Sequence, residues 1–368
     1  MGGRQVDFVV FSHLRWDFVY QRPQHLMSRA ARGHRVLFVE EPVHGEGFDV
    51  ESSEVAPGLS VLRCAVPASA PRDSADAFTA GAVHHVVSEW QKDELVVWHY
   101  SVMAEPLSRG LPAAVTVYDC MDELNAFIDA TPEIPVRERD LIDRADLVFT
   151  GGHSLWEAKR GLHPRVYAFP SSIDVAHFGR ARLAQPEPAA IAAIPHPRFV
   201  FAGVIDERMD LSLVSALADA EVGEVVLIGP VAKINPEDVP AGPHIHKLGR
   251  REYEDLPAFF SHADVGIMPF ALNEATRYIS PTKTPEYLAA GLPVVSTSVA
   301  DVVRAYGDLD MVTIADGPDA FIAACSAAAS RSPDLDAVDE RLGQTSWDAT
   351  WAAMERLIHE VLAQSRAA

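Results

Sequence analysis

The stretch YISPTKTPEYLAAGLPVVST, residues 278–297, carries the most informative pattern in this chain. It sets a lysine and a glutamate one helical turn apart, at Lys283 and Glu286, and then continues into residues built for burial. Pro285 suits the first position of a helix with Thr284 as its N-cap, and Gly291 suits its end. Two opposite charges therefore lie at the start of a short, buried helix. The alternative is a capped helix with an ordinary surface pair.

Working outward from this stretch, short apolar runs alternate with longer amphipathic segments, which is typical of α/β layers around parallel sheets. Runs rich in Val, Ile, Leu and Phe indicate sheets that are covered on both faces. We predict strands at residues 6–12, 35–41, 59–65, 95–100, 114–120, 146–152 and 165–173, and a second series at 198–205, 224–230, 244–250, 264–270, 293–299 and 310–316.

The two series of strands are separated by residues 179–197, whose Ala- and Pro-rich composition predicts a linker. We therefore expect an N-terminal Rossmann-like domain over 1–178 and a second over 198–345. Residues 346–368 predict an amphipathic helix with one apolar stripe, formed by Trp347, Trp351, Met354, Ile358 and Val361.

Composition excludes several classes of function. The chain has 368 residues, 48% of them hydrophobic, and a formal net charge of −21, which argues against a nucleic-acid partner. Cys64, Cys120 and Cys325 are too widely spaced for a disulfide framework or a metal site, so we expect buried free thiols. We find no apolar run long enough for a membrane span or a secretion signal. We expect a cytoplasmic protein that meets the inner face of a membrane, if at all, from its surface.

Ligands of open parallel sheets bind beyond the carboxyl ends of the strands, and two facing sheets form a cleft there. Lys283 and Glu286 follow a predicted strand, so they should face this cleft. Lys283 beside a helix N-terminus would attract a phosphate, and Glu286 could accept hydrogen bonds from ribose hydroxyls. Together the two side chains predict a site for a nucleoside diphosphate.

The pattern P-x-K-x-x-E-Y-L-A-A-G-x-P-V-V resembles the donor-binding segment of GT-B glycosyltransferases, particularly bacterial exopolysaccharide and cell-wall enzymes of the family 1/4-like group. FSHLRWDFVYQRPQHL, followed by YDCMDE, resembles the acceptor-side half of those proteins. The order of elements agrees over nearly the whole chain. The resemblance implies two Rossmann-like domains facing across a cleft, with a C-terminal helix that crosses back to the first domain.

The resemblance also implies the activity. A sugar would pass from a nucleoside diphosphate sugar, which we expect to be UDP-linked, to a hydroxyl of a glycan or lipid-linked glycan. No cofactor or metal is implied, because the lysine and helix dipole neutralise the leaving diphosphate. In the larger retaining group two glutamates are separated by seven residues; Glu286 matches the second, but Tyr278 stands at the first. S-x-T-K-x-x-E, with Ser280 and Thr282, is also similar to the donor loop of an inverting GT-B glucuronosyltransferase. Stereochemistry therefore stays open.

Further donor contacts are expected after the strands of the second domain. Gly203 lets a ligand approach the backbone, and Arg208 could reach a pyrophosphate, although a surface arginine in a plain turn is equally compatible. By resemblance, Arg250 would lie near the nucleotide base. Phe270 would either line the base pocket or belong to the core.

In the first domain we expect Arg15, Trp16, Asp17 and Arg22 to form a loop beside the donor phosphates and the acceptor; a helix start packed by Trp16 is the alternative. An inverting transferase needs a base, for which Asp119 and Asp122 are candidates, with helix capping as the rival role of Asp122. His99 occupies a strand end where relatives often carry a functional histidine, or is a structural residue.

Other chemistries lack their motifs, because GxGxxG, GxxxxGK[ST], HExxH and GxSxG are all missing at the required places. Two alternatives to transfer remain. One is a nucleotide-sugar epimerase on the same fold, which needs no acceptor groove. The other is a non-catalytic partner that only binds a nucleotide sugar.

Overall fold

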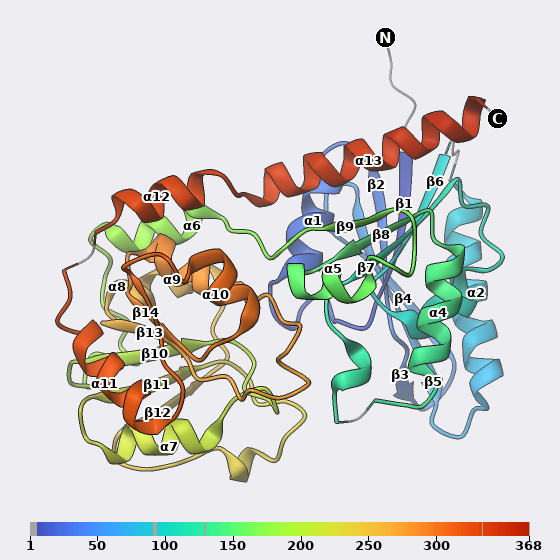
Figure 1. Ribbon diagram of the computed structural model, residues 1–368. Helices are drawn as coiled ribbons and strands as arrows, with labels where there is room; N and C mark the ends of the chain where they lie inside the picture. Colours follow the sequence, from blue (N-terminus) through green and yellow to red (C-terminus); the bar gives the residue numbers. More distant parts are fainter. Residues whose placement is uncertain (1–5, 91–93, 129, 333, 368) are drawn as a thin grey trace.

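The computed structural model describes residues 6–90, 94–128, 130–332 and 334–367. These residues form two α/β domains side by side, with a long C-terminal helix lying across the first (Figure 1). One sheet has the strand order β3-β5-β2-β1-β6-β7-β8-β9, with β4 paired to β5, and the other has the order β12-β11-β10-β13-β14-β15. In both sheets the first strand of the domain lies in the interior, so the strand order reverses beside it.

The seven strands predicted for the first domain are present, with ends that differ by a few residues. All of them pair in parallel, which requires crossover connections between consecutive strands of the sheet. Their bounds are β1 (Val6–Ser12), β2 (Arg35–Glu40), β5 (Leu59–Pro67), β6 (Glu94–His99), β7 (Val115–Cys120), β8 (Leu147–Thr150) and β9 (Val166–Ala168).

Two further strands were not predicted, β3 (Val43–Gly45) and β4 (Asp49–Ala56). β4 runs antiparallel to β5, and its side chains are largely exposed. An exposed strand at the sheet edge needs no apolar run, so composition does not mark it. The helices of this domain are α1 (Arg22–Ala30), α2 (Arg72–Ser88), α3 (Glu105–Ser108), α4 (Ile134–Arg144) and α5 (His153–Lys159).

All six strands predicted for the second domain are also present and parallel. They are β10 (Arg198–Ala202), β11 (Glu224–Ile228), β12 (Ile245–Gly249), β13 (Val265–Met268), β14 (Val294–Ser296) and β15 (Val312–Ile314). The helices around them are α6 (Val175–Phe178), α7 (Leu211–Asp219), α8 (Leu256–Ser261), α9 (Lys283–Ala290), α10 (Ala300–Tyr306), α11 (Pro318–Ala328) and α12 (Asp336–Gly343).

The segment expected as a linker, 179–197, is packed rather than free. Ala181, Ile191 and Ile194 belong to the hydrophobic core of the second domain, together with Ile173 and Phe178 just before them. Alanine and proline therefore indicate a connection here but do not indicate a loose one, because a few apolar residues suffice to anchor it.

The C-terminal helix α13 (Trp347–Ala367) returns to the first domain and lies against it (Figure 1). The five residues of the predicted apolar stripe are all buried and belong to the first domain's core cluster with Phe8 and Trp98. The three cysteines are free and buried, as expected. Among the described residues, no helix combines the length and the apolar character needed to cross a bilayer.

Candidate functional site

A cavity of about 440 Å³ lies between the two domains. Its second-domain wall is built by residues that follow the carboxyl ends of β10, β11 and β13, and by the start of α9. Its first-domain wall is the segment 16–22, with Met121 and Asp122 after β7. The cavity is therefore at the strand ends where ligands of parallel α/β sheets bind.

Helix α9 begins at Lys283, two residues earlier than predicted, with Thr282 rather than Thr284 at the N-cap. Thr284 is buried inside the first turn, where its hydroxyl lies 3.0 Å from Met268 Sδ. Pro285 still fits, because the N–H that proline lacks has no partner in a helix's first turn. Gly291 ends the helix in the left-handed conformation at φ 87°, as predicted.

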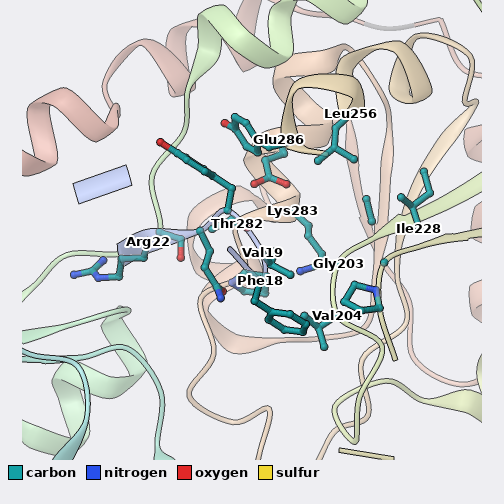
Figure 2. A pocket seen from close by; sticks show the side chains of 18 of the residues that line it. Phe18, Val19, Arg22, Gly203, Val204, Ile228, Leu256, Thr282, Lys283 and Glu286 are labelled. Atoms are coloured by element: carbon teal, nitrogen blue, oxygen red, sulfur yellow. The ribbon is translucent and has the colours of Figure 1, made fainter. Parts of the chain in front are cut away.

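Lys283 occupies the centre of the second-domain wall and extends beside Gly203 (Figure 2). A Cβ at position 203 would overlap Cε and Nζ of Lys283, so a glycine there makes room for the ammonium. Among the described residues, no carboxylate lies within 4.0 Å of this nitrogen. Burial lowers the pKa of Lys283 from its ordinary value, and Glu286 opposes the shift. The amine is thus held at the cavity without an ion-pair partner.

Glu286 lines the same cavity one turn further along α9. Burial raises the pKa of its carboxyl, and the Lys283 charge counteracts that effect. Both groups therefore lose solvation at the cavity. An anion beside Lys283 and a hydroxyl beside Glu286 would each replace the lost water.

Arg208 lines the cavity and is oriented by a residue that sequence reasoning missed. Asp206 is buried and accepts two parallel hydrogen bonds from Arg208, at 3.0 Å from Nε and 2.6 Å from Nη2. Across the cleft, Asp122 lies 3.9 Å from Arg208 Nη1. The pattern Asp-x-Arg after a strand end was the available signal for this fork.

The first-domain wall brings together three of the four residues predicted for the loop, Trp16, Asp17 and Arg22. Arg250 of the second domain donates a hydrogen bond to the carbonyl of Asp17, at 2.6 Å, and so joins the two walls. Gly203, Phe270, Ser280 and Thr282 also line the cavity. Phe270 is buried as well and belongs to the core.

Asp119 is not placed as a catalytic base. Its carboxylate is fully buried, and both oxygens accept hydrogen bonds from Arg22, at 3.0 Å from Nε and 2.8 Å from Nη2. Arg22 also donates to the carbonyl of Phe169. Of the two candidate aspartates, Asp119 within β7 and Asp122 just after it, only Asp122 lines the cavity.

His99, Arg15 and Tyr278 also lie outside the cavity lining. His99 is buried and stacks on Phe11, with ring centroids 5.2 Å apart; burial and the Arg144 charge lower its pKa to about 3. Such a histidine is neutral and without access to substrate. Arg15 is ion-paired with Glu40 at 3.0 Å.

Tyr278 packs instead against a hydrophobic cluster of the first domain, with the Arg277 guanidinium 5.3 Å from its ring centroid. The position at which the larger retaining group carries its first glutamate is thus absent from the cavity wall in this chain.

Two tyrosines at the cavity were missed. Tyr20 of the first domain and Tyr253 of the second both line it, and their ring centroids are 4.8 Å apart. The sequence FVYQRP carries aromatic residues that hinted at Tyr20, but nothing in REYED pairs Tyr253 with it.

Comparison with known proteins bears on these features. Residues 196–331 match the family model described as Glycosyl transferases group 1, and this range includes Gly203, Arg208, Lys283 and Glu286. TuaH of Bacillus subtilis (strain 168), named for a proposed role as a teichuronic acid biosynthesis glycosyltransferase, is 26% identical over 139 residues. That match spans 36% of this chain and 35% of the length of TuaH.

Solved structures resemble the chain over nearly its full length. Sucrose-phosphate synthase (tll1590) from Thermosynechococcus elongatus has a TM-score of 0.73 at 16% identity, covering 98% of this chain and all 100% of that one. Anabaena Alr3699/HepE, in complex with UDP, has a TM-score of 0.62 at 13% identity, covering 97% and 100%. The E. coli trehalose-6-phosphate structure bound with UDP-2-fluoro glucose has a TM-score of 0.67 at 12% identity, covering 97% and 99%. At these identities the likeness shows the fold alone, which is GT-B.

Proposed function

We propose that this chain, which has the GT-B fold and a second domain that matches the group 1 glycosyltransferases, transfers a sugar from a nucleoside diphosphate sugar to an acceptor hydroxyl. The donor we propose is UDP-linked. The proposed acceptor is a glycan or a lipid-linked glycan, and the reaction needs no metal ion.

One observation carries this proposal. The ammonium of Lys283 lies at the N-terminus of α9 and has no ion-pair partner within the part of the chain that the structure describes. When the bond between the sugar and the diphosphate of the donor breaks, the nucleoside diphosphate that leaves gains negative charge. A lysine and a helix N-terminus that are already aimed at that position stabilise the developing charge without rearrangement. Arg208, which Asp206 orients through Nε and Nη2, lies on the same wall and can donate a hydrogen bond from Nη1 to a phosphate oxygen.

The UDP part of the proposal rests on the relatives and on Glu286. HepE was solved with UDP, and the E. coli structure was solved with UDP-2-fluoro glucose. Glu286, one turn beyond Lys283, can accept hydrogen bonds from the two ribose hydroxyls, while the phosphates meet Lys283.

The acceptor would bind along the first-domain wall. Trp16, Phe18 and Tyr20 line the cavity there and offer aromatic surface to the apolar face of a sugar ring. Arg15 and Arg22 are each neutralised by a carboxylate of their own domain. A neutral sugar hydroxyl would therefore suit this wall better than a diphosphate, and Asp122, which lines the cavity, is the base that we propose for its proton.

A thermal-shift panel tests the donor site. Because a ligand that binds only the folded state raises its stability by mass action, UDP should raise the Tm more than GDP, ADP or TDP does. Lys283→Ala should abolish that shift, and Lys247→Ala, which removes an exposed lysine outside the cavity, should retain it. No shift with any nucleotide, or equal shifts in all three proteins, would remove the proposal.

Activity then separates transfer from the two alternatives. A transferase releases free UDP from a UDP-sugar when a glycan acceptor is added, whereas the net reaction of an epimerase keeps the nucleotide joined to the sugar. A partner that only binds the nucleotide sugar would give a thermal shift, but it would produce neither free UDP nor an epimerised nucleotide sugar.

A further inference from the structure

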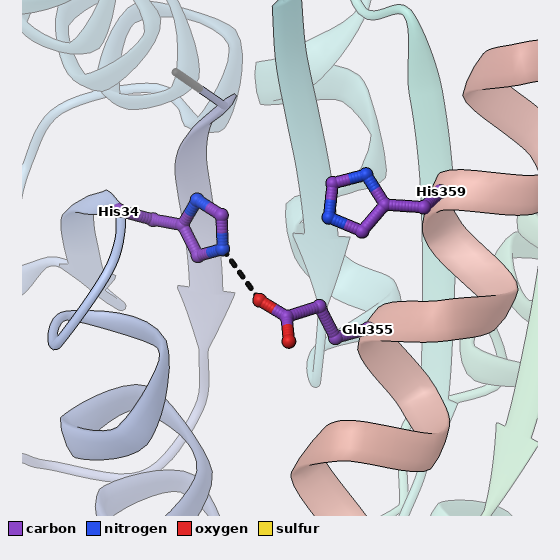
Figure 3. A group of neighbouring side chains, drawn as sticks. All are labelled: His34, Glu355 and His359. Atoms are coloured by element: carbon purple, nitrogen blue, oxygen red, sulfur yellow. Dashed lines mark hydrogen bonds and ion pairs between the residues drawn. The ribbon is translucent and has the colours of Figure 1, made fainter. Parts of the chain in front are cut away.

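Three potential metal ligands meet where the C-terminal helix lies on the first domain (Figure 3). Glu355 and His359 lie on α13, and His34 lies in the connection between α1 and β2. One ligand atom from each, a ring nitrogen of each histidine and a carboxylate oxygen, lie within 4.8 Å of one another. None of the three lines the interdomain cavity.

We propose that His34, Glu355 and His359 form a binding site for a first-row transition cation of the Zn²⁺ class, which joins α13 to the first domain. Two imidazoles and one carboxylate are the ligand set that such cations accept, and three protein ligands leave one tetrahedral position for water. The site is separate from the proposed glycosyl transfer, which needs no metal.

The local structure holds His34 and Glu355 in place and leaves His359 free to adjust. Glu355 and His359 are four residues apart on a helix, so their side chains project from the same face. The His34 ring is fixed by aromatic neighbours, with its centroid 5.2 Å from that of Phe8 and 6.4 Å from that of Trp351. Only 12% of the His34 side chain is exposed, whereas His359 is exposed and free to adjust.

A hydrogen bond now occupies part of the proposed site. His34 Nε2 lies 2.6 Å from Glu355 Oε1, a short hydrogen bond between two groups that are both metal ligands. A divalent cation would replace the shared proton, as metals do when they bind imidazole and carboxylate. His34 Nδ1 has no hydrogen-bond partner among the described residues, so no other contact opposes the change of tautomer that frees Nε2.

The required adjustment is small. Metal–ligand distances of 2.0–2.2 Å at tetrahedral angles place ligand atoms about 3.4 Å apart. A spacing at the 4.8 Å limit must therefore close by roughly 1.4 Å, and the 2.6 Å between His34 Nε2 and Glu355 Oε1 must widen by roughly 0.8 Å. A new rotamer of the exposed His359 can provide the first movement. A bound metal ion would link α13 directly to the α1–β2 connection, and these two segments are far apart in the sequence.

The test uses the full chain without a histidine tag, stripped with EDTA and then titrated with ZnCl₂ by calorimetry. We expect one equivalent of Zn²⁺ to bind, with a Tm that rises with zinc concentration. His359→Ala should lower the affinity at least about 100-fold, since loss of even an outer-shell partner costs 10–100-fold. Because His359 is exposed, the variant should fold normally.

His85→Ala is the matched control. His85 also lies four residues from a glutamate, Glu89, at 3.8 Å on the exposed face of α2, and no group of three ligands includes it in the described part of the chain. This variant should bind zinc as the wild type does. Co²⁺ should give strong visible absorption in the wild type and His85→Ala but not in His359→Ala. Wild-type zinc affinity in His359→Ala, or no saturable binding in the wild type, would overturn the proposal.

Discussion

Lys283 reaches the cavity by passing over Gly203, a residue 80 positions earlier in the chain, in the space that a Cβ at position 203 would fill. The glycine and the lysine therefore depend on each other. A strand end of the second domain must carry no side chain for the first residue of α9 to present its ammonium.

Replacing Gly203 with alanine should displace Lys283 and weaken nucleotide binding, at some cost in stability because the backbone there has φ 157°. A charge-assisted hydrogen bond contributes about 1.5–3 kcal/mol, so we expect the UDP affinity to fall about 10- to 100-fold. Calorimetric titration with UDP measures this directly. Gly242→Ala is the control, because a Cβ there meets nothing within 4 Å. Equal affinities in both variants would show that Lys283 does not contact the nucleotide.

Asp122→Asn should abolish most of the transfer while leaving nucleotide binding intact. The substitution keeps the side chain's size and removes its ability to take a proton, which typically costs 10²–10⁴-fold in rate. UDP release with acceptor present gives the rate, and the UDP thermal shift reports binding. Asp238→Asn, at an exposed position of the second domain, controls for loss of charge. An unchanged rate in Asp122→Asn would assign the base elsewhere, to another cavity carboxylate or to the leaving phosphate of a retaining reaction.

The fold was predictable because its strands are buried and parallel. Val, Ile, Leu and Phe fill both faces of such strands, so all thirteen predicted strands are found. Two strands were not predicted, and β4 is the longer of them. It carries Asp49, Glu51 and Glu54 at exposed positions, and only its pairing with β5 makes it a strand.

The candidate site was predictable as an edge but not as a set of contacts. Side chains that follow parallel strands reach the carboxyl edge of their own sheet. The two edges face the same cavity, which is why Lys283, Glu286 and Arg208 of one domain meet Asp122 of the other. Sequence cannot show which of them already has a partner. Asp119 is ion-paired with Arg22, 97 residues away in the chain, and that pairing depends on the tertiary fold.

The Arg22–Asp119 pair gives a prediction about stability. Asp119→Ala leaves the Arg22 charge buried without compensation, which should lower the free energy of unfolding by about 3–5 kcal/mol. The double variant Arg22→Met with Asp119→Leu removes both charges and should be less destabilised than the single one. Urea denaturation compares the three proteins. A double variant less stable than Asp119→Ala would show that Arg22 stabilises the fold through its other contacts, such as that with Phe169.

Because His99 is buried, we expect the free energy of unfolding to fall in mild acid. Burial and the Arg144 charge lower its pKa to about 3, below the ordinary 6.5. Between these two pH values the unfolded chain therefore binds a proton at this residue and the folded chain does not. The stability contribution is complete above pH 6.5 and is lost as the pH falls toward 3. Between pH 7.5 and 5 this one residue should remove about 2 kcal/mol.

His99→Phe keeps a flat ring against Phe11 and removes the titrating group. Urea denaturation at pH 7.5 and pH 5 should therefore show about 2 kcal/mol less acid destabilisation in the variant than in the wild type. His44→Phe is the control, because His44 is exposed on β3 and should leave the slope unchanged. A His99→Phe variant with the wild-type slope would mean that His99 is protonated in the folded protein, and that its environment is more open to water than its burial indicates.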